Sequence, residues 1–130
     1  MHGFDQNGEL TVLIADHDDA ARRVVVRMLF RLGYKVLHAG CGEQALTISE
    51  RYNAPIDLLL TDVVLPPGSG AELVRKLRSS RPGMRVLYMS QHSSDDLERT
   101  LALCDAESLI HKPFSAGQLA AHLRDLLRDA

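Results

Sequence analysis

The chain has 130 residues, of which 45% are hydrophobic and 25% charged, and this balance is typical of one globular domain that buries a core without disulfide or metal support. The formal net charge of −2 predicts no direct binding to nucleic acid or to an anionic membrane surface. No apolar run approaches the roughly 18 residues of a membrane span. We expect residues 1–9 to be a flexible leader and residues 10–130 to form the domain.

The two cysteines give no sign of a metal or disulfide framework. Cys41 and Cys104 lie far apart in the sequence, and neither belongs to a Cys-x-x-Cys or Cys/His pattern. We therefore expect two reduced thiols in a cytoplasmic protein.

Strand-length apolar runs alternate with segments of helical periodicity along the chain. The run at 10–15 is continuously apolar, as in a parallel strand covered on both faces. In the next segment, apolar side chains recur at helical spacing, Asp19 is the expected N-cap, and Gly33 predicts the helix end. Prolines and glycines within 66–70 predict a loop. The expected strands are 10–15, 34–39, 56–61, 85–89 and 107–111, and the expected helices are 18–32, 43–51, 71–78, 95–103 and 115–128.

This alternation predicts an α/β fold with one parallel sheet covered by helices on both faces. Right-handed crossovers leave few topologies for a chain of this length. We expect a single doubly wound five-stranded sheet, flavodoxin-like (βα)5, with strand order 2-1-3-4-5.

Polar side chains stand at the carboxyl ends of four of the expected strands. Asp16 and His17 follow the first strand, Asp62 the third, Ser90 the fourth and Lys112 the fifth. Open parallel sheets bind ligands at this edge, where the strand order reverses. The first and third strands are neighbours there, so we expect Asp16 to lie beside Asp62.

These groups share a chemical use if the ligand is a phosphoryl group. A carboxylate can act as nucleophile and form an aspartyl phosphate. A divalent cation such as Mg²⁺ can bridge oxygens that would otherwise repel one another. A lysine supplies a positive charge for a phosphoryl oxygen, and a serine hydroxyl supplies a hydrogen-bond donor.

Each residue taken alone has an ordinary structural explanation. Asp16 could hydrogen-bond loop amides, Asp62 could form an Asx turn before the proline-rich loop, and Ser90 or Lys112 could be plain loop residues. The coincidence of all four at one edge favours a site.

Four segments, VLIADHDDAARR, DLLLTDVVLPPGSG, RVLYMSQHSS and LIHKPFSAGQL, resemble bacterial response-regulator receiver domains in their order and spacing. They are most similar to receivers attached to hybrid histidine kinases, and the resemblance covers roughly residues 10–127. It implies Asp62 as phosphoacceptor and Asp16 as an acidic-pocket residue. It also implies Ser90 and Lys112 as the residues that contact the phosphoryl group, and a Val64 carbonyl that binds the metal.

The resemblance implies a signalling module rather than an enzyme. The module would take a phosphoryl group from a histidine kinase or phosphotransfer protein, with Mg²⁺ or Mn²⁺ as cofactor. Output would pass through partners, and weak homodimers would form through the face made by the fourth helix, fifth strand and fifth helix.

Two positions depart from the family pattern. His17 stands where the family normally has a second acid that binds the metal directly, and imidazole is a poor partner for Mg²⁺. We expect weak Mg²⁺ binding and a relative preference for Mn²⁺, unless His17 faces solvent and Asp18 replaces it as ligand. Leu109 stands at the position of the family's aromatic switch residue, so we expect coupling to run through Ser90.

Other functions on the same fold remain alternatives. His17 raises the possibility of a degenerate receiver that binds proteins without phosphorylation. Flavin binding calls for a Ser/Thr/Gly-rich loop after the first strand, where the acidic stretch 16–19 stands instead, and the dinucleotide pattern G-x-G-x-x-G is absent. A phosphatase with paired acids on one strand end fits the Asp16–Asp18 spacing only loosely.

Overall fold

The computed structural model describes residues 9–91 and 108–128, and within them it contains one five-stranded parallel sheet. The spatial order of its strands is β2-β1-β3-β6-β7. Counted within this sheet alone, the order is 2-1-3-4-5, so the predicted topology is confirmed. The strands are β1 (Thr11–Ala15), β2 (Lys35–Ala39), β3 (Leu58–Asp62), β6 (Arg85–Ser90) and β7 (Leu109–His111).

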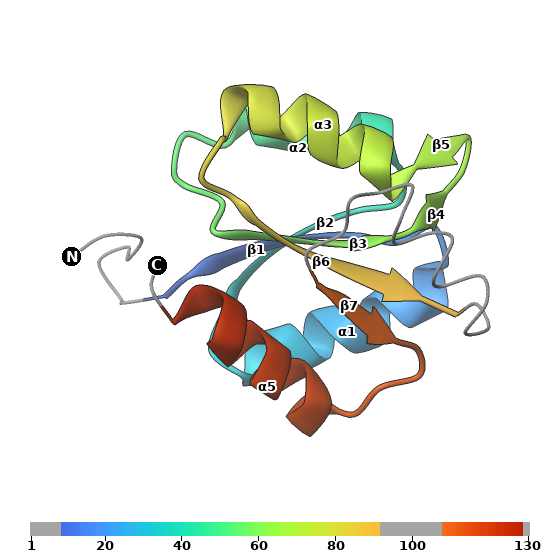
Figure 1. The fold of residues 1–130 in the computed structure, drawn as a ribbon, viewed down its shortest axis with the longest axis vertical. Coiled ribbons are helices and arrows are strands. Elements are labelled where there is room, and N and C mark those ends of the chain that lie inside the picture. Colours follow the sequence, from blue (N-terminus) through green and yellow to red (C-terminus); the bar gives the residue numbers. More distant parts are fainter. Residues whose placement is uncertain (1–8, 92–107, 129–130) are drawn as a thin grey trace.

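Helices cover both faces of this sheet (Figure 1). On one face lie α1 (Asp19–Arg31) and α5 (Ala116–Leu127), and on the other lie α2 (Gly42–Arg51) and α3 (Gly70–Ser80). Among the helices of the described ranges, none has the length and apolar character to cross a membrane. The helix expected at 95–103 lies outside the described residues, so of the expected dimer face only the strand β7 (Leu109–His111) and the helix α5 are described.

Side-chain alternation along the central strands divides the core into two layers. Leu13 and Leu59 face α2 and α3, whereas Ile14 and Leu60 face α1 and α5. Successive strand residues point to opposite faces of a sheet. Asp16 and Asp62 each come two residues after Ile14 and Leu60. By the same alternation, their two carboxylates point to the same side of the sheet.

The ends of α1 are fixed by local capping. Asp18, not the expected Asp19, is the N-cap, because its side chain accepts a hydrogen bond from the Ala21 N–H at 3.0 Å. At the other end, Gly33 adopts φ +95° and stops the helix as predicted.

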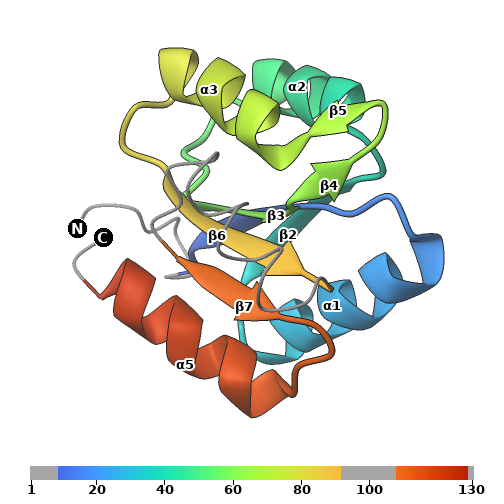
Figure 2. The ribbon, with the colours of Figure 1, turned by 45° about the vertical axis from the view of Figure 1, so that its right-hand side comes forward.

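The segment expected to be a loop before α3 contains a short antiparallel ribbon. It consists of β4 (Val64–Leu65) and β5 (Gly68–Ser69), which stand beside the start of α3 (Figure 2). Ser69 then caps α3 by accepting from the Glu72 N–H at 3.2 Å. The prediction of a loop within 66–70 was therefore wrong for Gly68 and Ser69, which form β5.

Cys41, the N-cap residue of α2, is a free and half-buried thiol. Cys104 lies outside the described residues.

Candidate functional site

Every residue that the sequence predicts as a site residue lines one cavity. Its volume is about 200 Å³, which is room for several water molecules. It lies at the carboxyl ends of β1, β3, β6 and β7, the edge at which open parallel sheets bind ligands. The lining includes Asp16, His17, Asp62, Val64, Ser90 and Lys112.

The strand register explains why these side chains meet. Ala15 is level with Thr61, Asp62 with Met89, and Ser90 with His111. The four strands therefore end side by side. The residues at these ends are consequently neighbours across the sheet, although they are far apart in the sequence.

Lys112 joins the two carboxylates. Its Nζ lies 2.8 Å from Asp16 Oδ2 and 2.9 Å from Asp62 Oδ1. All three side chains are nearly inaccessible to solvent, with exposed fractions of 9%, 0% and 9% for Lys112, Asp16 and Asp62. Buried charges persist only when they are paired in this way. The Lys112–Pro113 peptide bond that follows is cis.

Burial and hydrogen bonding shift the pKa values of the two carboxyls in opposite directions. Burial, and the neighbouring Asp16, raise the pKa of Asp62 from 3.8 to about 6. Burial alone would raise the pKa of Asp16 as well. Its hydrogen bonds, including those from Lys112 and from the Asp18 N–H, outweigh burial and hold its pKa below 3.8. Burial would lower the pKa of Lys112, but the two carboxylates raise it, so the lysine stays charged.

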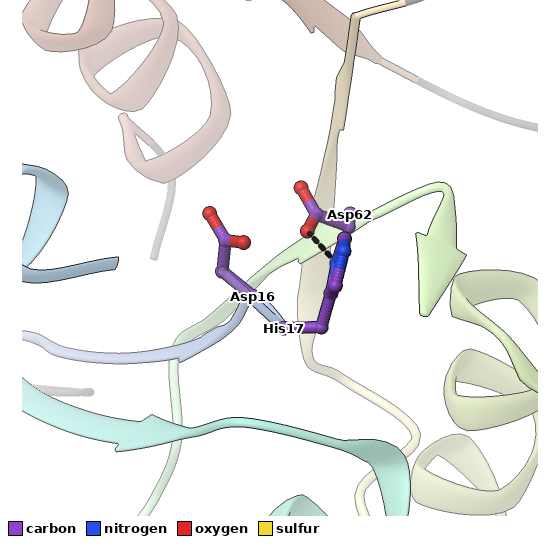
Figure 3. A group of neighbouring side chains, drawn as sticks. All are labelled: Asp16, His17 and Asp62. Carbon is purple, nitrogen blue, oxygen red and sulfur yellow. Dashed lines mark ion pairs between the residues drawn. The ribbon is translucent and has the colours of Figure 1, made fainter. Parts of the chain in front are cut away.

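His17 stands at the mouth of the cavity and faces Asp62 (Figure 3). Its Nδ1 lies 3.6 Å from Asp62 Oδ2, and its side chain is 54% exposed. Asp18, which also lines the cavity, has its Oδ1 engaged by the Ala21 N–H. Of these two residues, His17 is therefore the one that presents a ligand atom beside Asp62.

Two residues that support the site were missed at the sequence level. A Cβ at Gly70 would collide with the backbone carbonyl oxygen of Asp62, so α3 can begin this close to β3 only with glycine there. Arg22 donates from Nη1 to the Asp16 carbonyl oxygen at 2.7 Å. Gly70 is the last residue of the segment DLLLTDVVLPPGSG, but from the sequence alone it predicts only a loop. The arginine, six residues after Asp16, carried no signal.

The response regulator receiver domain family matches residues 12–124 of the chain. The chain belongs to this family. The receiver is 35% identical over 123 residues to the sensor kinase CckA of Brucella abortus (strain 2308), covering 95% of this chain and 13% of that protein. It is 30% identical over 118 residues to the response regulator receiver protein CpdR of the same organism, covering 91% of each.

A solved structure of the receiver domain from the hybrid histidine kinase CckA has the same fold, with a TM-score of 0.75 and 31% identity over 90% of this chain and 98% of that one. The predicted likeness to receivers attached to hybrid kinases is thus confirmed. The receiver spans from 13% to 50% of the length of several curated relatives.

The family implies a divalent cation at this acidic pocket, and the donor set fits Mg²⁺ only in part. Asp16, His17 and Asp62 each offer one ligand atom, and these atoms lie within 4.8 Å of one another. The two carboxylates suit a hard cation, whereas the imidazole nitrogen does not.

Proposed function

We propose that this receiver accepts a phosphoryl group on Asp62 from a histidine kinase or phosphotransfer protein of a two-component system in the cytoplasm. The observation that supports this proposal is the placement of Lys112 between Asp62 and Asp16, in one cavity with Ser90. The arrangement combines a nucleophilic oxygen, a fixed positive charge and a hydroxyl donor.

In the proposed transfer, an oxygen of Asp62 forms a bond to phosphorus as the bond between phosphorus and the donor's nitrogen breaks. Lys112 is already within 2.9 Å of Asp62, so its charge is in place to offset the charge that arrives. Ser90 supplies a hydroxyl on the same cavity wall. A divalent cation bound to Asp16 and Asp62 would supply further neutralisation.

The proposed switch runs from the cavity to β6 and β7. Lys112 donates its backbone N–H to the Ser90 carbonyl at 2.8 Å, which ties the ends of these strands together. A phosphoryl group that contacts the side chains of Lys112 and Ser90 would therefore act on the joined ends of β6 and β7. Leu109 packs, half-buried, against the core layer under α2 and α3, and it offers no aromatic ring for a rotation-based switch.

Intact mass spectrometry after incubation with acetyl phosphate and a divalent cation tests the acceptor. We expect one added phosphoryl group in the wild type and none in Asp62→Asn. Asp57→Asn is the matched control, because Asp57 is a half-buried aspartate that lies before the opposite end of β3, where it accepts from the Thr11 N–H at 2.7 Å. This control is expected to be phosphorylated normally. Absence of modification in the wild type would instead support a receiver that works without phosphorylation.

A further inference from the structure

His17 replaces an oxygen donor by a nitrogen donor at a position open to an incoming ion. Its Nδ1 lies 3.6 Å from Asp62 Oδ2, and the candidate ligand atoms of Asp16, His17 and Asp62 lie within 4.8 Å of one another (Figure 3). The half-exposed imidazole lets a cation approach with part of its water shell. The three side chains can therefore act on the same ion.

The adjacent acid is occupied elsewhere. Asp18 accepts the Ala21 N–H at 3.0 Å as the N-cap of α1, and its own N–H donates to Asp16 Oδ1 at 3.0 Å. Turning its carboxylate into the cavity would leave the first turn of α1 without its cap, which destabilises the helix. The structure thus favours His17 over Asp18 as the third ligand.

Carboxylate oxygens are also scarce in this cavity. Lys112 contacts Asp16 Oδ2 and Asp62 Oδ1, and Asp16 Oδ1 accepts the Asp18 N–H, so three of the four carboxylate oxygens already face a donor. Mg²⁺ requires a near-octahedral set of oxygens and gives up water reluctantly. Transition ions bind mixed nitrogen and oxygen sites with an affinity that rises from Mn²⁺ to Co²⁺ and Ni²⁺.

We propose that His17 is a direct metal ligand and makes this receiver selective for first-row transition ions over Mg²⁺. This inference rests on the proposed function, since it concerns the cation that accompanies Asp62. The imidazole nitrogen strengthens a preference that an acidic pocket made only of oxygens would show more weakly.

Calorimetric titration of metal-free protein with Mg²⁺, Mn²⁺ and Co²⁺, without a phosphodonor, tests the selectivity. The wild type is expected to bind Co²⁺ more tightly than Mn²⁺, and Mn²⁺ more tightly than Mg²⁺. His17→Asp is expected to reduce the ratio of Co²⁺ to Mg²⁺ affinity by about tenfold or more, because an oxygen replaces the nitrogen. Asp18→Asn keeps a capping side chain and is the matched control, with an unchanged ratio.

Pulsed electron paramagnetic resonance of the Mn²⁺ complex identifies the ligand directly. Coupling to an imidazole nitrogen is expected in the wild type and in Asp18→Asn, and is expected to vanish in His17→Asp. The inference is overturned by a ratio that does not change in His17→Asp, by nitrogen coupling that persists in that variant, or by a wild type that binds none of these ions. Failure of the proposed function is distinguishable, because it appears as absence of phosphorylation of a protein that binds metal normally.

Discussion

At the site, two carboxylates and one lysine are nearly inaccessible to solvent, and Asp62 is the one of the three whose charged form is least stabilised. Its pKa of about 6 in the folded protein lies above the ordinary 3.8, because burial and Asp16 disfavour the ionised form. The folded state therefore holds this proton more tightly than the unfolded state does. By linkage, this group favours folding most below pH 3.8, and that contribution is lost as the pH rises through about 6.

At pH 7 the ionised Asp62 carboxylate destabilises the folded protein, and replacing Asp62 by Asn removes this destabilisation. Lys112 is not left unpaired, since Asp16 still contacts it at 2.8 Å. We expect Asp62→Asn to raise the free energy of unfolding at pH 7 by about 1 to 2 kcal/mol. The gain should vanish near pH 4, where the wild-type carboxyl is protonated. Urea unfolding of both proteins with a chelator present, at the two pH values, measures the difference. A gain of equal size at both pH values would contradict the raised pKa.

Lys112 acts through its compact ammonium group, which fits between two carboxylate oxygens. A guanidinium carries a wider, planar set of donors and cannot take the same place. We expect Lys112→Arg to fold and to be phosphorylated, but to transmit the change poorly to the end of β6. The measurement is the phosphorylation-induced shift of the Ser90 amide resonance in NMR spectra. Lys35→Arg, at an exposed position on β2, is the control, and equal shifts in wild type and Lys112→Arg would exclude a switching role.

At the level of elements, the sequence predicts the strand ends well because burial and register act on whole strands. Continuous apolar runs fixed β1 and β3 to within two residues, and parallel pairing then brought Asp16 beside Asp62. The choice between two neighbouring N-cap residues of α1 was harder to predict. Asp18 and Asp19 are both good N-cap residues, and only the path of the chain decides between them.

The β4–β5 ribbon and the close approach of α3 could not be read from the sequence for a related reason. Prolines and glycines predict a turn, but two-residue pairing depends on how the turn is held against the rest of the molecule. Gly70 is such a case, because its lack of a side chain matters through the Asp62 carbonyl and the Thr61 methyl group beside it.

Gly70→Ala places a methyl group against that carbonyl, so the start of α3 or the end of β3 must move. We expect a loss of about 1 to 3 kcal/mol in the free energy of unfolding, together with slower phosphorylation of Asp62. Chemical denaturation and the rate of reaction with acetyl phosphate measure the two effects. Gly83→Ala is the matched control, because a Cβ there meets no atom within 4 Å, and it should change neither quantity. Normal stability and rate in Gly70→Ala would show that the contact is not needed.

In the whole molecule, the site lies at one edge of the sheet beside an apolar groove on the α1 face. The groove has a volume of about 400 Å³, and its walls come from α1 and from the segment that includes Lys112, Pro113 and Phe114. Val24 on its α1 wall is 55% exposed. A protein that brings a phosphoryl group to Asp62 must cover the surface around the cavity, so this groove is available for its apolar side chains.

We expect Val24→Asp to slow phosphoryl transfer from a protein donor by about tenfold, since a charge would have to be desolvated in the contact. Transfer from acetyl phosphate should be unchanged, because a small donor does not need the groove. Phe30→Asp is the matched control: Phe30 is 74% exposed on the same helix but does not line this groove. Rates of transfer from the purified histidine-phosphotransfer protein that reacts fastest with the wild type measure the effect. Equal slowing by both substitutions would point to a general charge effect, and no slowing by Val24→Asp would remove the groove from the donor contact.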